Sequence, residues 1–453
     1  MDFAFQMAEW ADQLTFDNLP EETVHQTRCR VLDSLSTLLG GYRADPARIA
    51  RKVAESDDGA ATILGTGRKT RPELAAFANG TAVRYLDYND TYLSLEPAHP
   101  SDNIPACWAA AETASATGKD LITAIVIAYE IQCRLCDAAS LRAHGWDHVT
   151  YGAFSATLGA GKLLGLSQEQ MVHAMGIAGV SSIATRQTRT GELSMWKACA
   201  FSNVARAGVF AAELARNGMT GPNEIFEGPK GVFNQLTGGP FDIVLGDSEK
   251  GFMLPKTYIK NWPAEYHSQS AIDAALKLRE NWTESQEIES ITIETFEAGY
   301  SIIGSEKEKW RPTSRETADH SLPYCTVVAF IDGDVTVDSF ETERFTDPEV
   351  LRLLDVTKVL YNPDLDSGYP KGIPNLLKIK LKDGRTFEER VDFPPGHSEN
   401  PLNNYQVENK FRLLAEGIID DTTADRIVDA AWHLEQLDSL DALLGWTVAA
   451  ALP

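Results

Sequence analysis

The sequence has few cysteines, no long apolar run and no excess of basic residues. Its 6 cysteines among 453 residues are too sparse for the disulfide framework of a small secreted domain. The most apolar stretches, such as LITAIVIAYEI, fall short of the ~18–20 residues that a membrane span requires. The opening segment MDFAFQMAEWADQLTF has acidic residues where a secretion signal needs a basic start. These absences predict a cytoplasmic protein that does not cross a membrane.

Charge of one sign dominates, since 41 Lys and Arg stand against 65 Asp and Glu and give a formal net charge of −24. Such a field repels polyanions, which argues against nucleic acid and anionic membranes as partners. It does not exclude a small anion, because a few cations can dominate the field inside a pocket.

Sequence signatures of cofactor binding are also missing. There is no GxGxxG loop after a strand, no GxxxxGK[ST] loop and no GxSxG elbow. Cys133 and Cys136 form a CxxC inside an apolar helical pattern, where buried packing is the better interpretation. His144 and His148 have metal-ligand spacing, but a glycine and a tryptophan lie between them. We therefore expect neither a cofactor nor a metal.

The apolar periodicity predicts a mainly α protein with a second α+β domain. Helical patterns rich in small residues run to about residue 250, and helical patterns return after residue 400. Between them, SITIETF and VTKVLYN favour strands, and NLLKIKLKDGRTFEERVDF alternates around Asp383-Gly384 as a hairpin does. We predict a large all-helical domain from residues 1–253 and 401–453, and a smaller α+β lid from residues 254–400.

Polar residues gather in segments that interrupt the apolar helices. In RYLDYNDTYLSLEPAHPSDN, Asp87, Thr91 and His99 lie in a stretch that two prolines make irregular. Polar loops on a rigid scaffold commonly carry catalytic groups. The same residue types also cap helices, so a purely structural role stays open.

Four more segments add histidines, cations and a tyrosine. Cations there could hold a substrate carboxylate, and histidine or tyrosine could move protons. The alternatives are ion pairing with the many carboxylates and ordinary packing of tyrosine. Acid–base groups and cations without cofactor signatures fit lyase or isomerase chemistry beside a carboxylate. The candidates are His148; Arg186, Arg189 and Lys197; Lys260, His267 and Gln269; and His320 and Tyr324.

With these residues assembled, the whole chain resembles the MmgE/PrpD family. The resemblance rests on LDYNDTYLSLEPAHPSDN, DHVTYGAFSATLGAGKLLGL, KNWPAEYHSQSAIDAAL and ETADHSLPY, with support from LARNGMTGP, FEGPKG and ENPLNNYQVENKF. It implies a helical domain with an α+β lid, a homodimer, and dehydration of the tricarboxylate 2-methylcitrate without metal or cofactor. The family's catalytic positions fall on Asp87, Thr91, His99, His148, Lys197 and Tyr324.

From this resemblance we predict a division of labour. Lys197, His148 and Lys260 would anchor carboxylates, with Arg186, His267, Gln269 and His320 as further substrate contacts. His99 or the Asp87/Thr91 pair would remove the proton. Tyr324 or His320 would protonate the departing hydroxyl as the lid closes.

Two departures from the family pattern bear on the substrate. Gln269 stands where the decarboxylase branch has a histidine, and LEPAHP stands where close dehydratases have Trp-Gly before the His-Pro. The alternatives are dehydration or hydration of citrate and cis-aconitate, cis-aconitate decarboxylation and iminodisuccinate epimerisation. A non-catalytic binding protein is a further alternative, which would tolerate substitution of His99, Lys197 and Tyr324.

Overall fold

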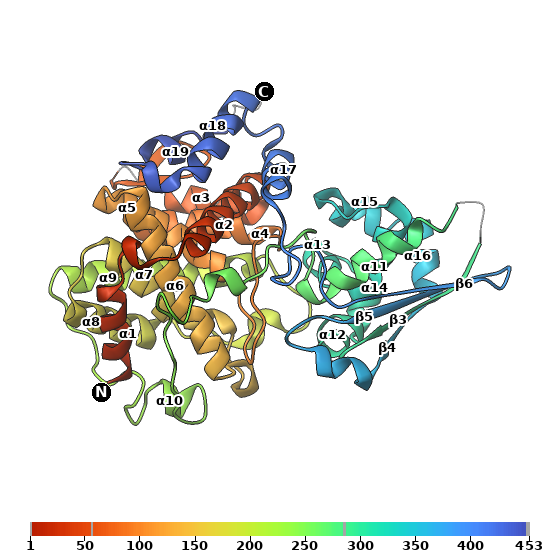
Figure 1. Ribbon diagram of the computed structural model, residues 1–453, viewed down its shortest axis with the longest axis horizontal. Helices are drawn as coiled ribbons and strands as arrows, with labels where there is room; N and C mark the ends of the chain where they lie inside the picture. Colours follow the sequence, from red (N-terminus) through yellow and green to blue (C-terminus); the bar gives the residue numbers. More distant parts are fainter. Residues whose placement is uncertain (1, 56–57, 284–286, 450–453) are drawn as a thin grey trace.

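The structure, a computed structural model, describes residues 2–55, 58–283 and 287–449. It has a large helical body and a smaller sheet-containing lid beside it (Figure 1). The predicted fold class, mainly α with a second α+β domain, is confirmed. None of the helices in the described ranges combines the length and apolarity needed to cross a membrane.

The helical body draws on both ends of the chain. Its core includes side chains from Phe3 to Ile259 and again from Val407 to Leu444. The returning segment packs α17 and α18 against α2, and Figure 1 shows this C-terminal segment lying along the red α2. The helices are α1 (Phe3–Gln13), α2 (Glu21–Gly40), α3 (Asp45–Ala54), α4 (Pro72–Tyr85), α5 (Ile104–Ala114), α6 (Gly118–Ala138), α7 (Gly152–Leu163), α8 (Gln168–Ser181), α9 (Trp196–Arg216), α10 (Val232–Gln235), α17 (Asn404–Ala415), α18 (Asp421–Trp432) and α19 (Asp441–Gly445).

Small residues let these helices approach closely. A Cβ atom on Gly80 of α4 would lie 2.7 Å from Ser202 Oγ of α9, and one on Gly208 of α9 would lie 2.8 Å from Thr157 Oγ1 of α7.

The predicted all-helical domain is wrong in one detail, because β1 (Ala61–Ile63) and β2 (Arg68–Thr70) form an antiparallel ribbon in it. A strand of three residues is too short to show the alternation of apolar and polar residues by which a strand is recognised in a sequence.

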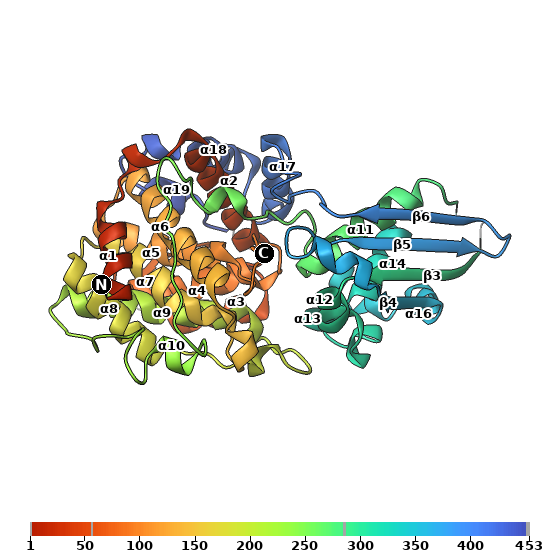
Figure 2. The same ribbon diagram turned by 60° about the horizontal axis from the view of Figure 1, so that its bottom comes forward.

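The lid is a four-stranded sheet covered on one face by helices. Its strand order is β4-β3-β5-β6, with β3 parallel to β4 and antiparallel to β5, and β5 antiparallel to β6. Figure 2 shows the sheet at the far end from the helical body, with α11 and α14 along it. The elements are α11 (Gln269–Arg279), β3 (Ile288–Thr295), α12 (Glu297–Gly299), α13 (Arg315–Ala318), α14 (Leu322–Asp332), α15 (Thr342–Phe345), α16 (Pro348–Asp355), β4 (Thr357–Tyr361), β5 (Asn375–Leu381) and β6 (Thr386–Val391).

The lid has a separate core and meets the body through a third apolar cluster. The lid core runs from Trp262 to Val391 and packs the helices against the inner face of the sheet. Leu93 and Tyr258 meet Tyr266, Phe296 and lid residues further along the chain in the third cluster. The body and the lid therefore meet in the region where the polar segments described in the sequence analysis come together.

Candidate active site

A cavity of about 490 Å³ lies between the helical body and the lid. Its volume falls in the range typical of small-molecule sites. Body residues from the loop after α4 and from the segments flanking α7 and α9 line one side, and lid residues line the other. Of the eight charged or imidazole residues that we predicted as substrate contacts or catalysts, all but Lys197 line the cavity, and Thr91 lines it as well. The seven are Asp87, His99, His148, Arg186, Lys260, His267 and His320.

Asp87 is the centre of the cavity floor. It follows α4 in a left-handed backbone conformation (φ 50°), which aspartate tolerates better than most residues. Its carboxylate lies 2.6 Å from Arg84, 2.7 Å from Lys260 Nζ and 3.3 Å from Lys197 Nζ. Burial opposes its ionisation, but the charges of Arg84, Lys197 and Lys260 hold its pKa well below the usual range. Asp87 is therefore a fixed anion that gathers three cations.

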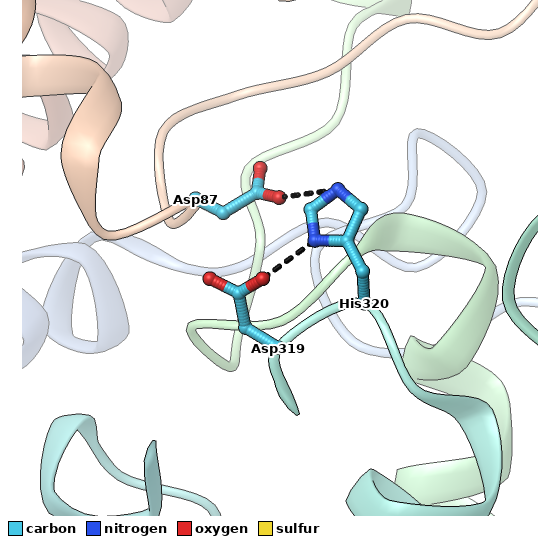
Figure 3. A group of neighbouring side chains, drawn as sticks. All are labelled: Asp87, Asp319 and His320. Atoms are coloured by element: carbon cyan, nitrogen blue, oxygen red, sulfur yellow. Dashed lines mark hydrogen bonds and ion pairs between the residues drawn. The ribbon is translucent and has the colours of Figure 1, made fainter. Parts of the chain in front are cut away.

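His320 lies between two carboxylates, one from each side of the cavity. Its Nδ1 is 2.5 Å from Asp319 Oδ1 and its Nε2 is 3.3 Å from Asp87 Oδ2. Figure 3 shows the imidazole held between Asp87, on the loop of the body, and Asp319, on the lid. Burial and the neighbouring Lys197 lower the pKa of His320. The arrangement can satisfy both N–H groups of an imidazolium, so this residue can carry a transferable proton.

The same three side chains are spaced to hold a metal ion, the one such group among residues 2–55, 58–283 and 287–449. The ammonium of Lys197 already lies 3.3 Å from Asp87, 3.2 Å from Asp319 and 3.1 Å from His320 Nδ1. A divalent cation at this point would meet that positive charge at contact distance. The donor set therefore does not fit a metal.

His99 has its tautomer set by its neighbours. Arg84 can only donate, and its Nη2 lies 3.0 Å from His99 Nε2, so Nε2 is the acceptor. The proton is then on Nδ1, which donates to the carbonyl of Asp90 at 2.8 Å. Burial, together with Arg84 and Lys260, holds the pKa of His99 well below its usual range. His99 is a neutral acceptor whose lone pair Arg84 already uses.

His148 differs because one of its nitrogens is unused. Its Nδ1 lies 3.1 Å from Asp147 Oδ1, and Arg189 Nε lies 3.1 Å from the other carboxylate oxygen. Its buried Nε2 has no hydrogen-bond partner among the residues described. Burial and nearby arginines lower the pKa of His148 to about 3, against the opposing effect of Asp147. His148 therefore presents a neutral, oriented imidazole with a free lone pair.

His267 repeats this arrangement on the opposite side. Its Nδ1 lies 2.7 Å from Glu265 Oε1, and its Nε2 is likewise unpartnered within the described part of the chain. Burial opposes ionisation of Glu265, but His267 lowers the pKa of that carboxyl to about 2. The His267 ring packs against Phe296 and Tyr369, which stack on each other, whereas the His148 ring faces His99 at 5.9 Å. Thus His148 adjoins the charged floor and His267 an aromatic wall.

The rest of the lining combines cations with an apolar wall and two further carboxylates, Glu297 and Glu306. Arg142, Arg186 and Lys309 add positive charge, and Leu93, Leu193 and Ile302 add apolar surface. The departure at LEPAHP has a structural role: the buried Glu96 accepts hydrogen bonds from Ser140 Oγ and the Arg142 N–H. It thereby fixes the backbone that presents Arg142.

Three predicted site residues lie outside the cavity lining. Lys197 is one of them, but its ammonium contacts Asp87 and His320, which do line the cavity. Tyr324 is buried in the lid core, and its hydroxyl donates to the carbonyl of Ser339. Burial raises its pKa far above the ordinary value, so this geometry gives it no proton to supply to the cavity. The Gln269 amide donates to the carbonyls of Trp262 and Ala264 and stabilises that turn instead of contacting a ligand.

Several residues of the site were not among the predicted contacts. Arg84 sits three residues before Asp87 at the end of an alanine-rich helix, where a lone arginine on a buried face was the available signal. Asp319, Asp147 and Glu265 each stand within two residues of a candidate histidine. That adjacency indicated carboxylate partners for His320, His148 and His267.

The helical body, the α+β lid and a cleft of paired histidines and carboxylates define a class of two-domain proteins with an interdomain acid–base site. Family comparison makes the assignment specific: the profile of the MmgE/PrpD N-terminal domain matches residues 5–243, and that of the C-terminal domain matches residues 262–436. The chain belongs to the MmgE/PrpD family. The C-terminal match extends past the sheet into α17 and α18, which belong to the helical body. The boundary between the two family domains therefore differs from the division between the two hydrophobic cores.

Relatives with described activities match much of the chain. A probable 2-methylcitrate dehydratase of Saccharomyces cerevisiae is 32% identical over 74% of this chain and 70% of its own. A mitochondrial 2-methylcitrate dehydratase of Yarrowia lipolytica is 30% identical over 74% and 68%. A cis-aconitate decarboxylase-like protein of Aspergillus oryzae is 26% identical over 97% and 96%.

Proposed function

We propose that the protein is a hydro-lyase that removes water from 2-methylcitrate to give 2-methyl-cis-aconitate. One observation carries this proposal: an interdomain cavity holds clustered cations together with His148 and His267, whose Nε2 atoms have no hydrogen-bond partner among the residues that the structure describes. Removing a proton beside a carboxylate needs a base, and losing the neighbouring hydroxyl needs an acid. Clustered cations stabilise the charge that develops on the carboxylate.

The cations supply binding for a trianion. Arg84 and Lys260 lie on the floor, and Arg186, Arg142 and Lys309 add charge elsewhere in the lining. Guanidinium groups match carboxylates with two parallel hydrogen bonds, whereas lysine acts as a point charge. The apolar Leu93, Leu193 and Ile302 favour a substrate with an alkyl branch over unsubstituted citrate.

His148 is the proposed base. Its Nδ1–H faces Asp147, so the lone pair is on Nε2. Its pKa of about 3 makes it a weak base in the empty site, but three substrate carboxylates beside it would stabilise the imidazolium and raise that pKa. In the reaction Nε2 takes the proton from carbon, and the carbon–oxygen bond breaks on the adjacent atom.

His320 is the proposed acid in place of Tyr324. Burial lowers the pKa of His320, and the positive charge of Lys197 lowers it further. A bound trianion offsets that charge and so raises the pKa of His320. Protonated His320 then gives a proton to the departing hydroxyl, which leaves as water. Asp87, proposed earlier as a base, is too strongly paired with cations for that task; its proposed role is to align Arg84, Lys197 and Lys260.

Turnover of 2-methylcitrate by purified protein tests this proposal, followed by absorbance of the conjugated product. Lys197→Ala should lower kcat at least 100-fold, because the pairing of Asp87, Asp319 and His320 loses its central cation. Lys256→Ala is the matched control, since Lys256 is exposed, whereas Lys197 is buried and paired with Asp87 and Asp319. Absence of turnover on every tricarboxylate tried, with Lys197→Ala indistinguishable from wild type, would overturn the proposal.

A substrate panel separates the alternatives within the family. Citrate, cis-aconitate and iminodisuccinate report the related dehydration, decarboxylation and epimerisation activities. The position of Gln269 outside the cavity removes one argument against decarboxylation, so cis-aconitate belongs in the panel. A cytoplasmic location and a homodimer remain part of the proposal.

A further inference from the structure

A lysine from the returning C-terminal segment reaches the back of the site. Lys410 lies on α17, within the ENPLNNYQVENKF motif, and is 5% exposed. Its ammonium has three oxygen atoms nearby: Asp33 Oδ1 at 2.6 Å, the Tyr88 carbonyl at 2.7 Å and the Lys260 carbonyl at 2.9 Å. An ammonium carries three N–H groups, so each can face one acceptor.

The two carbonyls belong to the segments that build the cavity floor. Tyr88 directly follows Asp87, and Lys260 is itself a floor residue. Lys260 Nζ in turn donates to the Asp87 carbonyl at 2.8 Å and to its carboxylate at 2.7 Å. Lys410 therefore links the backbones of the Asp87–Tyr88 segment and of Lys260, and the side chains of Asp87 and Lys260 bond to each other on the cavity floor.

The tie acts on a backbone conformation that needs support. Asp87 has φ 50°, a region that non-glycine residues occupy only when their surroundings stabilise it. The contacts of Lys410 with Tyr88 include its ring, 3.8 Å from Nζ, as well as its carbonyl. An uncharged side chain of similar size could fill this space without the cost of burying an ammonium, but it could not bond to both carbonyls.

We propose that Lys410 is a positioning residue: by bonding the carbonyls of Tyr88 and Lys260, it sets the distance between Asp87 and Lys260 on the cavity floor. The inference rests on the proposed function, since the floor is taken to hold substrate carboxylates. Lys410 does not line the cavity, so it acts through these two residues.

The test compares Lys410→Met with wild type at a temperature well below the melting transition. We expect kcat for 2-methylcitrate to fall about 100-fold, the loss typical of a displacement of about 1 Å at a reacting centre, with a much smaller change in KM. Arg412→Met is the matched control on the same helix, because Arg412 is largely exposed and pairs with Asp425. It should leave both constants unchanged.

A second variant separates positioning from folding. Lys410→Met leaves the buried Asp33 without its cation, which can unfold the protein. In Lys410→Met/Asp33→Asn both charges are gone, so stability should recover while kcat stays low. A folded double variant with kcat within twofold of wild type would overturn the inference.

A crystal structure of the double variant tests the role of Lys410 independently of the proposed function. Without turnover by the wild type on any tricarboxylate, the proposed function fails, and the structure of the double variant decides the role of Lys410. Loss of the Lys260 Nζ contacts with Asp87 supports positioning. An unchanged Asp87 turn with those contacts intact refutes it.

Discussion

Histidines in one cavity acquire different chemistry from the atoms that face each nitrogen. His99 meets a donor at Nε2, and His320 meets carboxylates at both nitrogens. His148 meets a carboxylate at Nδ1 and, within the described part of the chain, no partner at Nε2. His99 is a committed acceptor, and we propose His148 as the base and His320 as the proton carrier. Residue type alone could not separate these roles, because the contacts of His99 with Arg84 and of His320 with Asp87 join separate segments.

At the residue scale, His148→Gln should lower kcat by about 10²–10⁴, the usual contribution of a general base. His144→Gln is the control, since His144 is exposed and four residues away. Retention of wild-type kcat in His148→Gln, with unchanged KM, would move the base role to His267.

The pH profile gives a second check on His148. Its pKa of about 3 leaves it unprotonated from pH 5 to 8 in the free enzyme, so it should add no acid limb to kcat/KM in that range. Asp147 raises this pKa, so Asp147→Asn should lower it further and weaken the base. We expect kcat to fall about tenfold, measured by initial rates across that range; an acid limb that disappears in His148→Gln would contradict the assignment.

At the scale of elements, local sequence signals specified most boundaries. Ser167 and Gln170 form the predicted capping box of α8. Gly384, at φ 93°, closes the predicted hairpin between β5 and β6. Cys133 and Cys136 are both buried in α6, as their apolar surroundings predicted. Such features depend on residues close in sequence, which is why pattern reasoning captured them.

The contact of α6 with the C-terminal segment offers a test at this scale. A Cβ atom on Gly118 would lie 1.7 Å from the Leu434 carbonyl oxygen, and the Gly118 N–H donates to the Leu437 carbonyl. Gly118→Ala should therefore destabilise the protein by about 2 kcal/mol through overpacking, seen as a lower urea midpoint. Gly239→Ala is the control, since its Cβ meets open space; equal midpoints for the two variants would contradict this packing.

At the scale of the whole molecule, charge is unevenly placed. The chain carries an excess of 24 negative charges, yet Arg84, Arg142, Arg186, Arg189, Lys260 and Lys309 all line one cavity. Surface acidity and a cationic interior can coexist, because low-dielectric walls make the nearest charges dominate.

The predicted homodimer is tested at the same scale. Val53 on α3 and Phe210 on α9 are exposed apolar side chains on helices that contact each other, and we propose that they lie in the dimer interface. Light scattering should give the mass of two chains for wild type and of one chain for Val53→Glu/Phe210→Glu. Leu413→Glu, at an exposed side chain of α17, is the control; dissociation by that change alone would place the interface elsewhere.

By itself, the sequence determined the fold class, the family and the segments that supply the site, because apolar periodicity, turn residues and motifs are local properties. Only the tertiary structure decided which polar residues meet. It brought Arg84 to His99, placed Lys197 at the centre of Asp87, Asp319 and His320, and buried Tyr324 against Ser339. Those outcomes depend on how two domains and a returning helix pack across hundreds of residues, which no local pattern encodes.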